Sequence, residues 1–135
     1  MRITQPLKMN YEFRRLYSKG VCTADSLLAV YCRKNGRKNN RLGITVGKKV
    51  GKAVLRNRLR RRIRESYRLS EGRMTTGWDI VVVGRVRAGQ SDYHRLNASL
   101  IKLLTKQGVI PKECDGNEEN SAVAHKVLPE EHLPG

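Results

Sequence analysis

The chain has 135 residues, which suits one domain, and its 39% of hydrophobic residues is enough to build a core. It shows neither an 18-residue apolar span nor a secretion signal, so we expect neither a membrane protein nor a secreted one. The three cysteines, Cys22, Cys32 and Cys114, lack Cys-x-x-Cys spacing. This pattern argues against a disulfide framework or a zinc site and favours the reducing cytoplasm.

Positive charge dominates the sequence and is unevenly distributed. Residues 108–135 hold two lysines and six acids, a formal charge of −4, so residues 1–107 carry +20 where the whole chain carries +16. A domain with this charge is destabilised by self-repulsion unless a polyanion neutralises it, which makes nucleic acid the first partner to consider. An anionic membrane is the alternative, but it would require a long apolar face opposite the basic one.

Hydrophobic periodicity and turn residues define the elements that we expect. In chain order they are a short helix from Asn10 that ends at Gly20, a candidate short strand at 21–24, a strand at 26–35, a strand at 41–49, a basic helix at 51–69, a strand at 77–86 and a helix at 88–108. The loop 36–40 lies between two strands and is predicted to be a hairpin connection. Residues 41–49 alternate apolar side chains with Gly43, Thr45 and Gly47, which invites a close approach to the backbone on that face.

The basic helix has two stripes of side chains. An apolar stripe repeats every four residues and would face the core: Leu55, Leu59 and Ile63. An arginine stripe follows one residue later, about 100° around the helix: Arg56, Arg60 and Arg64. Lys52 and Arg68 extend this second row. The helix therefore has one face for the protein and a wide face for charge.

These elements predict an α+β fold, a two-layer α/β sandwich with a sheet of about four strands and three helices in the order α-β-β-β-α-β-α. Residues 1–107 form the predicted RNA-binding domain. Residues 108–135 are acidic and without periodicity, and they are predicted to be a disordered tail.

The sequence lacks the residues expected of an enzyme that acts alone. Residues 1–107 contain only six acids, without a metal-type cluster, and the segment 47–52 misses the Ser or Thr that a phosphate-binding loop requires. Arginine, the residue that binds phosphate in bidentate fashion, supplies seven of the ten basic residues in 48–68. Asn57 could bind a base edge or a ribose hydroxyl. Phe13, Tyr17 and Tyr31 could stack on unpaired bases, although core packing is the stronger expectation for Phe13.

The segment "RLGITVGKKVGKAVLRNRLRRRIRESYR" closely resembles the signature of the bacterial ribonuclease P protein subunit family. The matching positions are Gly43, Lys48, Lys49, Gly51, Ala53, Val54, Arg56, Asn57, Arg58, Arg60, Arg61 and Arg64. The stretches "EFRRLY", "LLAVYC" and "GWDIVVVGR" agree in order and spacing, so the resemblance covers about residues 7–107. Gly47 departs from the pattern, since many relatives have Ser or Thr there.

The resemblance implies a subunit of the endoribonuclease holoenzyme that removes the 5′ leader of precursor tRNA in the cytoplasm. It implies that the basic helix forms a left-handed crossover, whereas the general rule would predict a right-handed one. The catalytic-RNA-binding residues would be Lys48, Lys49, Lys52, Arg56, Asn57, Arg58, Arg60, Arg61, Arg64 and Arg68. The leader cleft would contain Phe13, Tyr17 and Tyr31. Mg²⁺ would be held mainly by the RNA, so that no residue of the protein is catalytic and no protein partner is obligatory.

Two other classes of protein are considered. A general or ribosome-associated RNA-binding module would show the same charge and sandwich fold, without a preference for precursor tRNA that carries a leader. A protein-only nuclease would cleave without an RNA subunit, and the small number of acids argues against it.

Overall fold

The computed structural model describes residues 3–111 and confirms each predicted helix and strand, with ends that differ by a few residues. The elements are β1 (Thr4–Pro6), α1 (Asn10–Lys19), β2 (Val21–Ala24), β3 (Leu28–Lys34), β4 (Asn40–Val46), α2 (Ala53–Ser70), β5 (Trp78–Gly84) and α3 (Tyr93–Gln107). Three short 3₁₀ helices accompany them: η1 (Lys48–Val50), η2 (Glu71–Arg73) and η3 (Val86–Gln90). Strand β1 was not predicted, so the sheet has five strands rather than about four.

The strands form one mixed sheet in the order β1-β4-β5-β3-β2. Strand β5 is parallel to β4 and antiparallel to β3. The prediction that 36–40 forms a hairpin connection is therefore wrong, because β5 lies between the two strands that this loop joins. Strand β5 is apolar from Ile80 to Val83, and Ile80, Val81 and Val82 are fully buried. Such a strand is most stable in the centre of a sheet covered on both faces.

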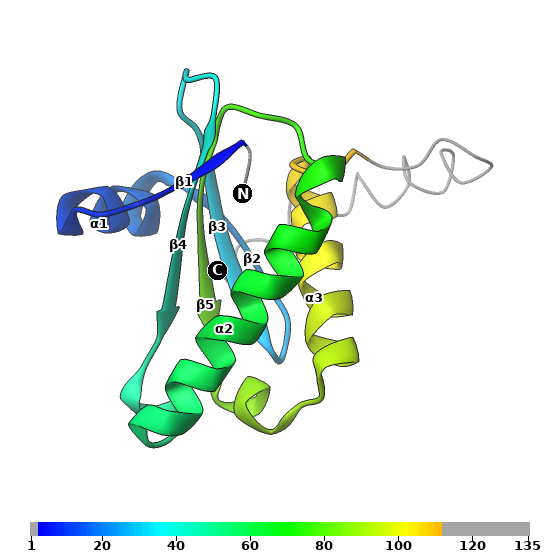
Figure 1. The fold of residues 1–135 in the computed structure, drawn as a ribbon. Helices are drawn as coiled ribbons and strands as arrows, with labels where there is room; N and C mark the ends of the chain where they lie inside the picture. Colours follow the sequence, from blue (N-terminus) through cyan, green and yellow to red (C-terminus); the bar gives the residue numbers. More distant parts are fainter. Residues whose placement is uncertain (1–2, 112–135) are drawn as a thin grey trace.

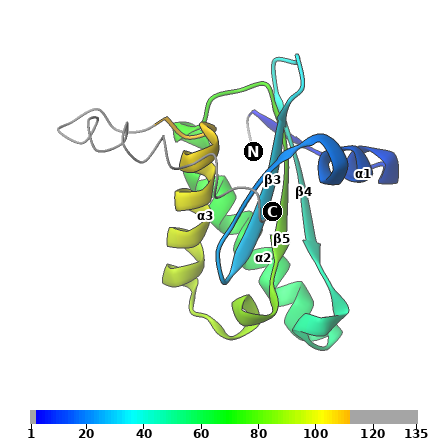
Figure 2. The ribbon, with the colours of Figure 1, turned by 180° about the vertical axis from the view of Figure 1, so that it is seen from behind.

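The connection from β4 through α2 to β5 is a left-handed crossover between neighbouring parallel strands (Figures 1 and 2). Right-handed crossovers dominate in parallel sheets because a right-twisted strand leads most easily into one. The resemblance implied the exception, and the structure confirms it.

The helices cover the two faces of the sheet unequally (Figure 1). Helices α2 and α3 pack on one face and enclose the larger hydrophobic core with residues such as Val30, Leu42 and Val82. Helix α1 lies on the opposite face, where Leu7, Leu16 and Val81 form a smaller core. Figure 2 shows the same arrangement from behind, with α1 separated from α2 and α3 by the sheet.

Helix α2 is attached to the sheet by the predicted apolar stripe. Leu59 and Ile63 are buried, and Tyr67 extends the stripe by one more turn. A Cβ atom at Gly84 would lie 2.8 Å from the Leu59 side chain, so glycine is required there for α2 to pack this closely on β5. The packing holds α2 firmly and leaves its other side for charged residues.

The last helix has a capping residue at each end and leads into further core residues. Asp92 accepts a hydrogen bond from the backbone N–H of Arg95, and Gly108 has a left-handed conformation with φ of 89°. Val109 and Ile110 are buried, so the packed part extends through Ile110, three residues beyond the predicted domain boundary. Residues 112–135 of the predicted tail, including Cys114, lie outside the described residues.

Candidate nucleic-acid interface

Basic side chains follow one another from the end of β4 along the outer side of α2. Eight of the ten residues predicted to bind the catalytic RNA are exposed: Lys48, Lys49, Lys52, Asn57, Arg58, Arg61, Arg64 and Arg68. The other two, Arg56 and Arg60, are half-buried beside the apolar stripe. The structure thus brings all ten together on η1, on the N-cap residue Lys52 and on the side of α2 that faces away from the sheet.

Short-range hydrogen bonds orient part of this surface. The Arg56 Nε–H donates to the Gly51 carbonyl at 3.1 Å, and an Arg60 guanidinium N–H donates to the Asn57 Oδ1 at 2.6 Å. These contacts restrict the rotamers of two arginines, which lowers the entropy that they lose on binding a phosphate. Arg68 differs, because it forms a two-bond ion pair with Glu65 at 2.6 and 3.1 Å.

Each acidic side chain of residues 3–111 has a hydrogen-bond or ion-pair partner within the protein. Glu65 pairs with Arg68, and Asp25 accepts from Ser99 and contacts Lys102. Asp92 caps α3, and Glu71 accepts the backbone N–H of Ile3. The remaining two, Glu12 and Asp79, share Arg41. Within the described residues no three His, Cys, Asp or Glu side chains gather into a metal-type group.

The opposite face of the sheet holds the three predicted aromatic residues. Register places Gly43, Val81, Tyr31 and Cys22 in one row across the strands, because each pair is aligned in its ladder. The Phe13 ring from α1 lies on Gly43: a Cβ atom there would be 2.5 Å from the ring. The predicted close approach to the small face of β4 is therefore made by Phe13, which is half-buried.

Tyr17 and Tyr31 lie edge to face beside this contact. Their ring centroids are 5.0 Å apart at an interplanar angle of 82°, and the Tyr17 hydroxyl is 3.2 Å from the Thr45 hydroxyl. Tyr17 is 40% exposed and Tyr31 is half-buried, so both present ring surface to solvent. Burial raises the pKa of the Tyr31 phenol, which keeps its proton available for donation. Phe13, Tyr17 and Tyr31 together are called the aromatic surface below.

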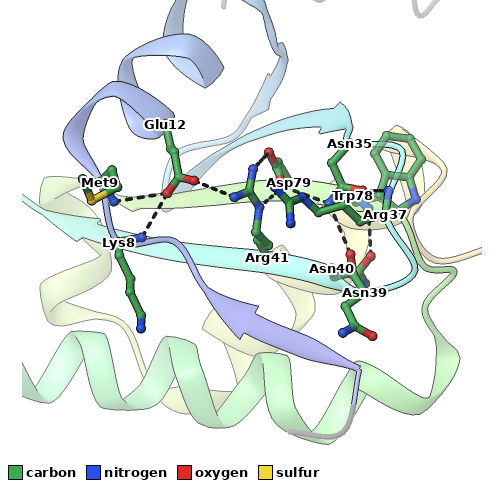
Figure 3. Close-up of polar contacts among 10 residues, drawn as sticks. All are labelled: Lys8, Met9, Glu12, Asn35, Arg37, Asn39, Asn40, Arg41, Trp78 and Asp79. Carbon is green, nitrogen blue, oxygen red and sulfur yellow. Dashed lines mark hydrogen bonds and ion pairs between the residues drawn. The ribbon is translucent and has the colours of Figure 1, made fainter.

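Helix α1 is fixed to the sheet by an ion-pair network (Figure 3). The Arg41 guanidinium binds Asp79 through two hydrogen bonds of 2.7 and 2.8 Å and Glu12 at 2.5 Å. Glu12 also accepts the backbone N–H groups of Lys8 and Met9 at the start of α1. All three charged side chains are 10–12% exposed. The Arg41 network therefore joins α1, β4 and β5.

These contacts lower the pKa values of both carboxyl groups. For Glu12 the largest cause is the hydrogen bond from the Met9 backbone, with Arg41 adding to it. For Asp79, burial opposes ionisation, but hydrogen bonds from Arg41 and Asn35 outweigh it and keep the pKa below its ordinary range. Both groups are therefore ionised in the native protein at neutral pH.

Comparisons with known proteins agree with this geometry. The family model described as Ribonuclease P matches residues 1–108. The ribonuclease P protein component of Alkaliphilus metalliredigens is 41% identical over 110 residues, which cover 82% of this chain and 99% of that protein. The chain belongs to the ribonuclease P protein family.

Solved structures of ribonuclease P proteins share the fold. The Staphylococcus aureus protein has a TM-score of 0.72 and 35% identity, with 78% of this chain and 96% of that one covered. The Thermotoga maritima protein has a TM-score of 0.70 and 33% identity, with 76% and 96% covered. The predicted family is confirmed, and with it the assignment as a subunit of the endoribonuclease holoenzyme.

The two candidate surfaces lie on opposite faces of the sheet, and Thr45, which the Tyr17 hydroxyl contacts, stands two residues before Gly47. The segment from Gly47 through η1 leaves β4 beside the aromatic surface and leads into α2. Gly47 has ordinary extended backbone with φ of −77°, and a Cβ atom there would meet nothing within 4 Å. A serine or threonine at this position would fit without strain.

Sequence reasoning missed several residues of the aromatic surface and its support. Thr45 could have been found, because it alternates with Gly43 and therefore points to the same side as the Phe13 contact. Glu12, Arg41 and Asp79 lie far apart in the chain, and no local pattern connects them. Within residues 3–111, none of the helices has the length and apolar character needed to span a lipid bilayer.

Proposed function

We propose that this protein binds the catalytic RNA of ribonuclease P through η1 and α2, and binds the 5′ leader of precursor tRNA on the aromatic surface. The complex then removes the leader by Mg²⁺-dependent cleavage and leaves the mature 5′ end of the tRNA. The observation that carries the proposal is the pairing of an anchored arginine helix with a partly open aromatic surface on the other face of the same sheet.

The basic surface suits a folded RNA. Its arginines are held on a helix that packs through Leu59 and Ile63, so they present an ordered array rather than a mobile chain. Guanidinium groups bind phosphate in bidentate fashion, and release of counterions from the RNA adds a strong, salt-dependent driving force. Family membership implies partnership with the ribonuclease P RNA, and we assign the contact to Lys48, Lys49, Lys52, Arg56, Asn57, Arg58, Arg60, Arg61, Arg64 and Arg68.

The aromatic surface suits a single strand. Tyr17 and Tyr31 offer ring surface at right angles to each other, and the hydroxyls of Tyr17 and Thr45 can exchange hydrogen bonds with a ribose or a base. Stacking on an aromatic ring is worth about 1–3 kcal/mol per base and tolerates any sequence. Such a surface fits a leader, which differs in sequence from one precursor to the next.

We further propose that the Mg²⁺ ions are held mainly by RNA. The acids of residues 3–111 are engaged in ion pairs, caps and hydrogen bonds, so the described part of the chain offers no carboxylate cluster as a ligand set. The protein's own contribution is to hold two RNAs together by screening phosphate repulsion. It needs no further protein for this role, and we place its action in the cytoplasm.

The experiment that tests the proposal is cleavage of a precursor tRNA at low Mg²⁺ by a bacterial ribonuclease P RNA, with and without this protein. We expect cleavage at the mature 5′ end only when both are present. If the protein binds RNA tightly but leaves cleavage unchanged, it is a general or ribosome-associated RNA-binding module instead.

Variants separate the two surfaces. Arg60→Ala should weaken assembly with the catalytic RNA. Tyr31→Ala should leave that assembly intact and reduce the preference for precursor over mature tRNA. Loss of assembly in Tyr31→Ala with an unchanged melting temperature would contradict the assignment of the aromatic surface to the leader.

A further inference from the structure

A groove lies at the edge of the sheet beside the arginine stripe, apart from the aromatic surface. Its residues are Thr4, Gln5, Pro6, Leu42, Ile44 and Arg64, and it encloses about 380 Å³. Small-molecule sites have volumes of roughly 300–1,000 Å³, so a single flat group of modest size would fit. These residues are called the edge groove below.

The fold explains why this groove is open. Parallel pairing aligns Thr4 with Asn40 and Pro6 with Leu42, which places the Thr4 and Pro6 side chains on the α2 face of the sheet. Strand β1 ends at Pro6, so within residues 3–111 the rest of β4 pairs with no strand on that side. Helix α2 buries Leu59, Ile63 and Tyr67, but Ile44 stays half-exposed and Pro6 exposed.

The chemistry of the lining differs from one side to the other. Pro6, Leu42 and Ile44 give it an apolar floor, while the Thr4 hydroxyl, 2.9 Å from the Tyr67 hydroxyl, adds a group that can both donate and accept hydrogen bonds. Arg64 is the last member of the arginine stripe and supplies a planar cation to the same groove. An apolar floor, a planar cation and a hydroxyl are groups that a nucleobase can use for stacking and edge recognition.

We propose that the edge groove binds one unpaired nucleobase of the catalytic RNA, with its phosphate beside Arg60 and Arg64. The inference rests on the proposed function, because the RNA that lies on α2 is the polyanion next to the groove. The base would lie on Ile44 and Pro6, with the Arg64 guanidinium against it. Arg64 belongs both to the groove and to the arginine stripe, which the proposed function places against the catalytic RNA, so we expect this RNA in the groove rather than a peptide or a lipid.

The first test is the affinity of the full-length protein for the catalytic RNA. Ile44→Ala removes the floor but no charge, so we expect about tenfold weaker binding with an unchanged dependence on salt. Ile101→Ala is the matched control, because Ile101 also packs half-buried against the larger core but lies on α3. Arg64→Ala should weaken binding and lower the salt dependence by about one counterion.

A double-mutant cycle tests whether the two groups share one base. If Ile44 and Arg64 hold the same base, the losses for Ile44→Ala and Arg64→Ala are less than additive in the double variant. Strict additivity would overturn the proposal, as would an Ile44→Ala variant that binds as tightly as the parent.

A crosslink identifies the occupant. A photoreactive phenylalanine in place of the exposed Pro6 should crosslink to one discrete nucleotide of the catalytic RNA, and the same group in place of the exposed Tyr11 on α1 should not reach that nucleotide. Crosslinks only to precursor tRNA, or none in an assembled complex, would overturn the inference and leave the proposed function standing. If the unchanged protein does not bind the catalytic RNA at all, the proposed function itself has failed.

Discussion

Gly43 shows how a single missing side chain shapes the aromatic surface. The Phe13 ring occupies the space where a Cβ atom would lie, only 2.5 Å away. The backbone conformation of Gly43 is that of an ordinary strand residue, so alanine is excluded by space rather than by strain.

Gly43→Ala should therefore displace Phe13 and destabilise the protein by about 1–3 kcal/mol, the usual cost of overpacking a filled site. Preference for leader-bearing substrate should fall as well, because the ring would no longer lie beside Tyr17 and Tyr31. Urea unfolding and competition between precursor and mature tRNA measure the two effects. Gly47→Ala is the control, since that position is open and should change stability little.

Glu65 neutralises part of the positive charge of α2 by pairing with one arginine. It forms a two-bond ion pair with Arg68, and both side chains are about half-exposed, at 48% and 50%. An exposed pair of this kind adds little to stability, but it neutralises a cation that could otherwise bind a phosphate.

Glu65→Gln should consequently tighten binding to the catalytic RNA and steepen its salt dependence by about one counterion. Arg68→Ala should weaken binding less than Arg60→Ala does, because Arg68 is already partly neutralised. Filter binding over a series of salt concentrations gives both quantities. An equal loss for the two arginine variants would show that RNA displaces Glu65 from Arg68 without cost.

At the level of elements, α1 is held on the sheet by the Arg41 network and by apolar contacts. Its apolar contact is the small core of Leu7, Leu16 and Val81, whereas α2 and α3 share the large one. Glu12 directly precedes Phe13 in α1. The network therefore also holds in place the part of the aromatic surface that α1 contributes, Phe13 and Tyr17.

Arg41→Ala leaves the buried Asp79 carboxylate without its cation, and we expect a loss of about 3–5 kcal/mol. Glu12→Gln is the milder variant: the fold should remain, the α1 end should loosen, and leader preference should decrease while assembly with the catalytic RNA stays the same. Melting curves and the two binding assays distinguish the variants. A Glu12→Gln protein with unchanged leader preference would show that the apolar contact alone positions α1.

At the scale of the whole molecule, the lowered pKa values of Glu12 and Asp79 couple stability to pH. Each group ionises more readily in the folded chain than in the unfolded one, whose carboxyl groups titrate near pH 4. Their stabilisation is therefore complete above about pH 5 and is lost as the pH falls through the folded values.

Urea unfolding at pH 7, 5 and 3 should give similar stability at the first two values and a clear decrease at the third. In Arg41→Ala the decrease should be smaller, because Asp79 no longer gains from being ionised. A decrease that already begins between pH 7 and 5 would require another group, since both carboxyl groups are fully ionised over that range.

The sequence by itself determined the identity and order of the helices and of every strand except β1, the charge of α2 and the family. These follow from local information. Leu55, Leu59 and Ile63 recur at the helical period, and the Arg-Asn-Arg segment belongs to a contiguous stretch of sequence that indicates the family. Periodicity shows which side of an element is apolar, but not which neighbour covers it. The short strand β1, with three residues, is below the length at which alternation is recognisable.

Only the tertiary structure decided that β5 separates β3 from β4, that Arg41 joins Glu12 to Asp79, and that the edge groove stays open. Each of these depends on contacts between residues far apart in the chain. The central place of β5 follows from burying Ile80 to Val82 between both helix layers, a gain that no local pattern records. The placement of the arginine stripe and the aromatic surface on opposite faces of one sheet follows from that strand order and from the left-handed crossover of α2.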